Sequence, residues 1–304
     1  MFSIVIPSWN NLEFLKLCVD SIRTHSKFDH EIIVHLNEGT DGSLEWVKAQ
    51  GIKYTHSQKN VGVCMSVNHL FAKARHDWVL YMNDDMVAAP GWDTAFAEAI
   101  KSVNTDLAVF FGTLIQPENN GNETIIKQDF GREPGTFDEK QFLAQFLADK
   151  RGDVEGRASQ PTLVSKKWWS MLGGYSMEFS PGMSSDDDLL MKFWVAGCRN
   201  FRIVGASRFY HFGCASTGRI KHNRGGHIFA LKWGITQSEF YRQYLGTLGQ
   251  PGGGNTADNP HNFPRPSMVS KLRRARYSLR YNYPLDGIEA WDALSGRGEW
   301  DEGN

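Results

Sequence analysis

Short apolar runs alternate with helical segments through the first 82 residues, and this alternation limits the fold more than any other feature of the sequence. Segments with apolar residues at helical spacing separate the runs. Strands that alternate with helices predict an α/β protein, in which helices cover both faces of a mostly parallel sheet. The runs have the length and the β-branched and aromatic content of strands, and they are Phe2–Ile6, Glu31–Leu36, Ile52–Tyr54 and Val79–Met82.

Polar side chains follow three of these strands, at Ser8, Asn37 and Asp84–Asp85. Parallel sheets bind ligands at the carboxyl ends of their strands, so these side chains are expected to share one site. Two carboxylates at the end of a buried strand repel each other and lose hydration, and a divalent cation bound with a phosphate relieves both costs. A turn before Pro90–Gly91 is the alternative. The position at a strand end favours a metal site for a phosphorylated substrate.

Composition excludes several classes of protein. The 304 residues are 41% hydrophobic and 22% charged, which is ordinary for a globular protein, and the net charge of -1 gives no general attraction to nucleic acid or membranes. No apolar stretch approaches the roughly 20 residues that span a bilayer, and the N-terminus reads as a strand and not as a signal peptide. The four cysteines form no close pairs, which predicts free thiols and a cytoplasmic location.

The rest of the chain divides by composition. A helix at Trp92–Val103 and a strand at Leu107–Leu114 are followed by a polar segment, 116–157, that resembles an insertion or lid. Residues 229–248 have the pattern of one amphipathic helix, and 251–266 have the composition of a linker. We therefore expect a main domain at 1–240, which the polar segment divides, and a helical, partly basic extension at 241–304.

Four segments, in order, resemble the family 2 glycosyltransferases with the GT-A fold. They are IVIPSWNN (4–11), EIIVHLNEGTDGS (31–43), KNVGVCMSVNHLFAKA (59–74) with the acidic segment after it, and SSDDDLLMKFWVAG (184–197) preceded by Leu172-Gly173-Gly174. The resemblance covers about residues 2 to 240. It implies a Rossmann-like sheet, transfer of a sugar from a nucleotide diphosphate sugar, and a DXD-type metal motif at residues 83–85. It also implies that 1–115 is the nucleotide-sugar-binding half of the domain and 158–240 the acceptor-binding half. Two positions depart from the family pattern, Leu36 for an acidic residue and Ser185 for a glutamate.

The resemblance assigns roles on the donor side. Asp85 is the first choice of ligand for Mn²⁺ or Mg²⁺, and His211 aligns with a family histidine that completes the coordination, although a core histidine is the alternative. Asp84 reaches a metal-bound water or the ribose, or is a solvated turn residue. Asn60 either contacts the base or forms a turn. The remaining donor-binding candidates, all in loops after strands, are Pro7, Ser8, Asn10, Asn37, Gly62 and Asn83.

On the acceptor side, the alignment places Asp186 as the base that removes the hydroxyl proton, with Asp187 as its rival because three consecutive aspartates allow a one-residue slip. Asp188 is the best candidate for a helix cap. In-line attack with such a base inverts the anomeric carbon, and a retaining path stays open without one. Trp169 and Gly174 are candidates for the acceptor wall, with core packing as the alternative for one of Trp168 and Trp169.

The predicted reaction uses a UDP-sugar and a glycan or lipid-linked glycan acceptor, such as a bacterial surface polysaccharide. A hydroxylated base in phage-type DNA, a catalytically inactive nucleotide-sugar-binding protein and a nucleotidyltransferase are the alternatives. The basic stretch 271–280 suits a membrane surface or nucleic acid, or is a solvated helix packed by its tyrosines. Membrane contact through this stretch would place the enzyme at the inner face of the membrane.

Overall fold

The structure is a computed structural model that describes residues 1–213, 219, 223–245, 266–280 and 301–302. Of the predicted linker at 251–266, only Pro266 is among these residues. Cys214, one of the four cysteines, and Ser216, which follows His211 by five residues in the segment that resembles the family, lie outside them. The four predicted strands are confirmed as β1 (Ser3–Trp9), β2 (Glu31–Asn37), β3 (Lys53–Ser57) and β4 (Trp78–Tyr81), and all the pairings among them are parallel.

The sheet becomes mixed beyond β4. Its described strands run in the order β11-β3-β2-β1-β4-β9-β6-β10-β5, with β7 beside β6 and β8 beside β10. β9 lies antiparallel between β4 and β6, while β10 lies parallel to β6 and antiparallel to β5. The bounds of these later strands are β5 Met86–Ala88, β6 Ala108–Gln116, β7 Ile126–Lys127, β8 Val154–Glu155, β9 Thr162–Ser165, β10 Asn200–His211 and β11 Asp301–Glu302.

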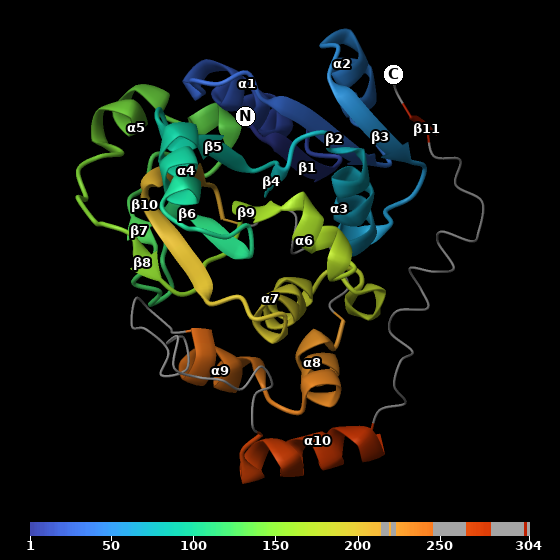
Figure 1. Cartoon of the computed structure of the whole chain (residues 1–304). Helices are drawn as coiled ribbons and strands as arrows, with labels where there is room; N and C mark the ends of the chain where they lie inside the picture. Colours follow the sequence, from blue (N-terminus) through green and yellow to red (C-terminus); the bar gives the residue numbers. More distant parts are fainter. Residues whose placement is uncertain (214–218, 220–222, 246–265, 281–300, 303–304) are drawn as a thin grey trace.

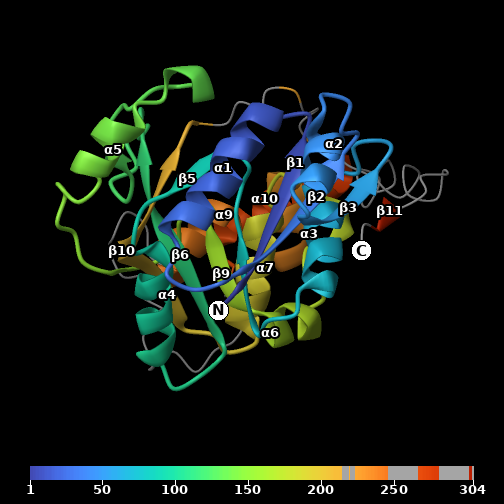
Figure 2. The ribbon, with the colours of Figure 1, turned by 90° about the horizontal axis from the view of Figure 1, so that it is seen from above.

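Helices cover both faces of the sheet (Figures 1 and 2). Successive residues of β1 point to opposite faces, so Val5 packs in one apolar cluster while Ile4 and Ile6 pack in the other. The cluster around Ile4 holds the helices α1 (Leu12–His25), α2 (Ser43–Ala49) and α4 (Trp92–Lys101). The cluster around Val5 holds α3 (Gly62–Lys73), α6 (Lys166–Met171), α7 (Ser185–Val195) and α8 (Gly225–Trp233).

The segment 116–157 is packed against the main sheet. It contains β7, a 3-10 turn at Pro134–Thr136, α5 (Glu139–Gln145) and β8. Phe130 and Phe142 from this segment pack with Tyr210 of β10 in a third apolar cluster. The segment is therefore integrated with the main sheet, because its aromatic residues share one apolar cluster with residues of β5, β6 and β10.

The prediction of a single helix at 229–248 is wrong. α8 ends at Gly234, whose φ of +79° is one that glycine adopts without strain. A new helix, α9 (Gln237–Phe240), begins after Thr236, whose side chain caps it, and a π-helical turn at Tyr241–Leu245 follows. α10 (Met268–Arg280) packs against α8. Among the described residues, none of the helices combines the length and the apolar character that crossing a bilayer requires.

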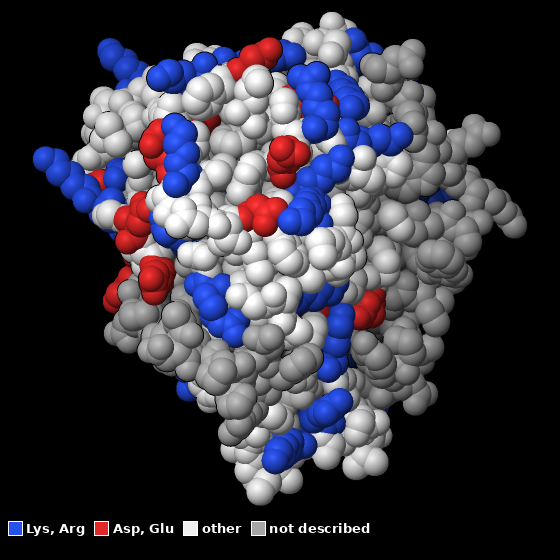
Figure 3. Space-filling model, viewed as in Figure 1, with Lys and Arg blue, Asp and Glu red and all other residues white. Residues whose placement is uncertain are grey.

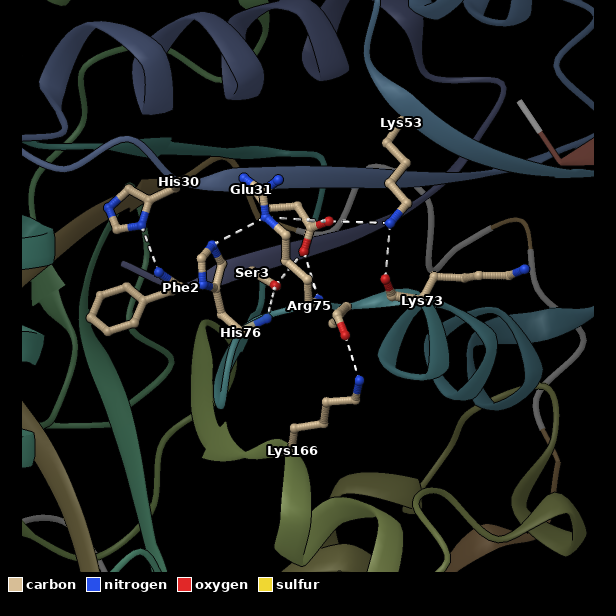
Figure 4. A network of polar contacts seen from close by, with 10 residues as sticks. Phe2, Ser3, His30, Glu31, Lys53, Lys73, Arg75, His76 and Lys166 are labelled. Atoms are coloured by element: carbon tan, nitrogen blue, oxygen red, sulfur yellow. Dashed lines mark hydrogen bonds and ion pairs between the residues drawn. The ribbon is translucent and has the colours of Figure 1, made fainter. Parts of the chain in front are cut away.

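Hydrogen bonds to a charged side chain stabilise the amino-terminal edge of the sheet, opposite the strand ends that carry the predicted site (Figure 4). Glu31 accepts hydrogen bonds from the Ser3 hydroxyl, the Arg75 backbone N–H and the Lys53 ammonium. Burial acts to raise the pKa of Glu31, but these donors outweigh it and hold the pKa below its ordinary value. Elsewhere on the face in Figure 3, acidic and basic side chains are interspersed.

Candidate functional site

A pocket opens at the carboxyl ends of β1, β2 and β4, where the sequence predicted one. Segments far apart in the chain form it, because the parallel strands end at the same edge of the sheet. Its lining residues are Pro7, Ser8, Trp9, Asn37, Asn60, Gly62, Val63, Tyr81, Asn83, Asp84, Asp85, Gln160, Pro181, Gly182 and Met183. Apart from Asn10, the predicted donor-binding residues all line this pocket, as does the predicted metal ligand Asp85.

Asp84 is buried in this pocket beside a second carboxylate. It is 5% exposed, and its Oδ2 accepts a hydrogen bond of 2.7 Å from the hydroxyl of Ser8. Burial, and then the charge of Asp85, raise the pKa of Asp84 to about 7, although the Ser8 hydrogen bond acts in the opposite direction. Without a positive partner, the two carboxylates therefore resist being ionised together.

His211 meets Asp85 across the sheet. β10 pairs antiparallel with β5 and places His211 opposite Met86, the residue after Asp85. The His211 Nε2 atom lies 3.3 Å from Oδ1 of Asp85, and both side chains are buried. The other ring nitrogen, Nδ1, contacts the side-chain amide of Gln116. The fold thus joins two candidate ligands that are 126 residues apart in the chain.

The His211–Asp85 pair has the chemistry of a cation site. Among the described residues, Nε2 of His211 has no hydrogen-bond partner. With the Gln116 amide turned so that its oxygen faces Nδ1, that oxygen accepts a hydrogen bond from the Nδ1–H, and Nε2 then presents a lone pair toward a carboxylate. A divalent cation satisfies both groups. No set of three or more His, Cys, Asp or Glu in the described part of the chain could hold a metal alone, so a cation here would need ligand oxygens or water as well.

Three predicted donor residues shape the pocket through contacts with the protein. The side-chain oxygen of Asn37 accepts from the Val61 N–H at 2.9 Å, so this buried amide fixes the loop before α3. The side-chain oxygen of Asn60 accepts a hydrogen bond of 2.9 Å from the Gly62 N–H. This contact agrees with the turn-forming role, which was the alternative to base contact. Gly62 has a φ of +76°, and a Cβ there would lie 2.9 Å from Cα of Pro181. This glycine allows the loop at Pro181 to close one side of the pocket.

The predicted donor contact of Asn10 is not supported. Its side chain donates to Glu38 at 3.0 Å and accepts from the Thr40 N–H at 2.9 Å. Asn10 is also absent from the pocket lining. Both polar ends of its side chain join the loop after β1 to the loop after β2, so its role is to hold these two loops together.

The three aspartates that open α7 have different surroundings. Asp188 is fully buried between the ammonium groups of Lys192 and Lys232 and makes no side-chain cap, so the predicted capping role is wrong. Asp187 is 6% exposed and pairs with Arg157 at 2.5 Å. Burial raises the pKa of Asp187 to about 6, against the opposing charge of Arg157. The Asp187 carboxylate also contacts Gln237 and Tyr241.

Asp186 is the aspartate most closely connected with the pocket. It is half-buried, and its Oδ1 accepts a hydrogen bond from the hydroxyl of Tyr175. The Tyr175 ring lies 6.2 Å from that of Tyr81, which lines the pocket. Burial raises the pKa of Tyr81, and the charges of Asp186, Asp84 and Asp85 raise it further. Asp186 does not itself line the pocket, and Tyr175 connects it to Tyr81, which does.

Trp169 and Gly174 were predicted to contact the acceptor, and the structure places both in the packed core. Trp169 is 4% exposed and stacks on Phe71 with ring centroids 3.7 Å apart. A Cβ at Gly174 would lie 2.3 Å from Oδ1 of Asn68. Asn68 in turn exchanges two hydrogen bonds of 2.8 Å with the backbone of Tyr175, so its role is structural.

Several residues around the site were missed by the sequence analysis. Tyr175 and Gln116 contact the predicted base and the predicted histidine ligand, and Arg157, Gln237 and Tyr241 surround Asp187. Tyr175 follows the Gly173-Gly174 pair directly, which was the available signal for it. The others come from distant segments that only the folded chain brings together.

Comparisons with known proteins agree with this geometry. Residues 3–152 match the family model described as glycosyl transferase family 2. A crystal structure of S. aureus TarS, residues 1–349, aligns with a TM-score of 0.55 and 12% identity over 96% of this chain and 78% of that chain. A structure of the same protein with UDP-GlcNAc aligns with a TM-score of 0.54 and 12% identity over 97% and 80%.

A third structure, GalNAc-T7 with UDP, GalNAc and Mn²⁺, aligns with a TM-score of 0.52 and 16% identity over 74% of this chain and 44% of that chain. No curated protein sequence matches this chain. Identities this low establish the fold alone, while the family match identifies the domain. Residues 3–152 therefore form a glycosyl transferase family 2 domain, and the chain is a glycosyltransferase with the GT-A fold.

Proposed function

We propose that this enzyme is a metal-dependent, inverting glycosyltransferase that moves a sugar from a UDP-sugar to a hydroxyl of a glycan acceptor. The observation that carries the proposal is the buried Asp85–His211 pair. Asp85 lines the pocket at the strand ends beside Asp84, and His211 contacts Asp85 from β10. Such a pair suits Mn²⁺ or Mg²⁺ together with phosphate oxygens.

The donor would enter with its diphosphate toward this pair. Asp85 and His211 would hold the cation, which when bound neutralises the negative charge that the leaving diphosphate gains. Asp84, held by Ser8, would face the ribose or a metal-bound water. The choice of UDP is supported by the similar structures, since TarS has been solved with UDP-GlcNAc and GalNAc-T7 with UDP and Mn²⁺.

Asp186 would act as the base that removes the proton of the attacking hydroxyl. The hydroxyl of Tyr175 holds one of its carboxylate oxygens, which leaves the other oxygen for the acceptor. Asp187, the rival, has its carboxylate engaged by Arg157, Gln237 and Tyr241. If Asp186 faces the side of the sugar opposite the leaving diphosphate, the attack is in line and inverts the anomeric carbon.

The acceptor proposal is a growing glycan or a lipid-linked glycan, such as a surface polysaccharide. We assign Trp169 a packing role and no direct contact with the acceptor, since Phe71 and Tyr175 cover its ring. The acceptor would instead approach Asp186 from the loop that contains Pro181, Gly182 and Met183, which lines the pocket.

The two candidate bases can be separated by matched substitutions. Asp186→Asn should lower the rate of Mn²⁺-dependent UDP-sugar hydrolysis by about 10²- to 10⁴-fold, with UDP binding and melting temperature preserved. Asp187→Asn should keep most of this activity, because Arg157, Gln237 and Tyr241 already engage the Asp187 carboxylate. The assays are coupled detection of released UDP and thermal denaturation.

Full hydrolysis by Asp186→Asn would overturn the assignment of the base. Wild-type protein that binds the UDP-sugar but neither transfers nor hydrolyses it would instead support an inactive binding protein. Asp20→Asn, at an exposed position of α1, is the control for loss of a single carboxylate.

A further inference from the structure

The outer face of α10 carries a stripe of exposed apolar side chains. Met268, Leu272 and Leu279 are 72%, 66% and 90% exposed, and Ala275 is exposed as well. These positions recur every three or four residues, so they lie on one face of the helix. Helices at the surface of a globular protein ordinarily turn such a face toward the core, and α10 does the reverse.

The inner face of α10 is polar and binds the body of the protein. The Ser270 hydroxyl donates to Glu239 of α9 and is buried, and the Arg274 guanidinium donates to the Leu231 carbonyl at 3.0 Å. The ring of Tyr277 lies 4.3 Å from that of His227 in α8. These contacts fix the rotation of the helix and keep the apolar stripe outward.

Cations border this stripe. The helix holds Lys271, Arg273, Arg274, Arg276 and Arg280 and has no acidic residue. At about 100° per residue, Lys271 falls on one border of the stripe and Arg276 on the other. Figures 1 and 3 show α10 at one extremity of the molecule, where blue and white surface meet without red on the face in view.

We propose that α10 docks the enzyme on a bilayer that contains anionic phospholipid. The helix would lie in the plane of the interface, with the apolar stripe among the upper acyl chains and the bordering cations at the lipid phosphates. Nucleic acid is a poorer partner, because the stripe that points outward would press Leu272 and Leu279 against charged phosphates. This inference concerns a surface outside the donor pocket and does not rest on the proposed reaction.

Sedimentation with phospholipid vesicles tests the proposal on the full chain. Wild-type protein should sediment with phosphatidylcholine vesicles that contain phosphatidylglycerol, much less with phosphatidylcholine alone, and less as salt is added. Changing Lys271, Arg273 and Arg276 together to Glu should lower the partition coefficient at least about tenfold. Changing Leu272 and Leu279 together to Ser should also lower it, with the salt dependence retained.

Matched controls lie elsewhere on the surface. Lys48, Lys101 and Lys140, all exposed, are changed to Glu for the same change in net charge, and Leu147 and Met171, which are 57% and 64% exposed, are changed to Ser. Both controls should partition as the wild type does.

Equal partition of the α10 variants and the controls would overturn the proposal. So would retention on duplex DNA or single-stranded RNA without vesicle binding, or a dimer in gel filtration that Leu272→Ser abolishes. UDP binding by each variant, measured alongside, shows that the donor pocket is intact and keeps this result separate from the proposed reaction.

Discussion

Asp84 is the residue that shows most clearly how the donor pocket lowers the stability of the folded chain. Burial and the neighbouring Asp85 raise its pKa from an ordinary value of 3.8 to about 7. A carboxyl whose pKa is higher in the folded chain than in the unfolded chain costs stability as pH rises between the two values, because the unfolded chain loses its proton first. The site therefore opposes folding at neutral pH unless a cation relieves it.

Asp84→Asn should stabilise the metal-free protein at pH 8 by an amount on the order of 2–4 kcal/mol, since the amide cannot ionise and can still accept from Ser8. The gain should nearly vanish at pH 4, where the wild-type carboxyl is protonated in the folded chain. Urea denaturation in EDTA at both pH values measures it.

A gain that is the same at both pH values would show that Asp84 is not a strained carboxylate. Asp20→Asn, which alters an exposed side chain, should change the free energy of unfolding little at either pH.

At the scale of elements, the turn between α6 and the loop before α7 sets the position of Asp186. Gly174 has a φ of +58°, and the Asn68 amide lies close against it. The same amide holds both backbone polar groups of Tyr175. Tyr175 then holds Asp186, so packing at one glycine is transmitted to the proposed base.

Gly174→Ala should therefore lower both stability and turnover. We expect a loss of about 1–3 kcal/mol, because the new Cβ displaces the Asn68 side chain, and a fall in the hydrolysis rate with UDP affinity kept. Gly173→Ala is the matched control, since Gly173 has a φ of +75° but no atom within 4 Å of the new Cβ. If both variants lose equal activity, backbone strain and not the Asn68 contact would be the cause.

The parts of the structure that depend on local sequence patterns could be predicted. The strands that end at Ser8, Asn37 and Asp84 follow from local apolar patterns, and so does the pocket at their ends. The prediction of one helix at 229–248 failed because Gly234 ends α8. The glycine is a local signal for a helix end, but the prediction gave more weight to the apolar periodicity around it. Trp169 was misplaced because an aromatic side chain in the core and one in a binding wall look alike in sequence.

Partners across the sheet could not be predicted from patterns alone. His211 reaches Asp85 only because β10 returns antiparallel beside β5, and a pairing register depends on the whole sheet. The resemblance to a family supplied His211 as a candidate. It supplied no hint of Gln116 or Tyr175, whose side chains hold His211 and Asp186.

At the scale of the whole molecule, the site joins the matched family domain to the part of the chain beyond it. Residues 3–152 match the family model, yet His211 and Asp186 lie outside that range. The loop at Pro181 closes on the first half through the contact of Gly62 and a hydrogen bond of 2.8 Å from the Val63 N–H to the Pro181 carbonyl. The proposed reaction thus needs both parts of the chain held together.

Calorimetric titration of UDP with and without Mn²⁺ tests the central claim, metal-assisted binding of the donor at Asp85 and His211. We predict that Mn²⁺ strengthens UDP binding at least about tenfold, or 1.4 kcal/mol. His211→Ala and Asp85→Asn should each remove this gain. GDP and dTDP should bind more weakly than UDP. UDP affinity that is equal in Mn²⁺ and EDTA, or a full Mn²⁺ effect in both variants, would contradict the account.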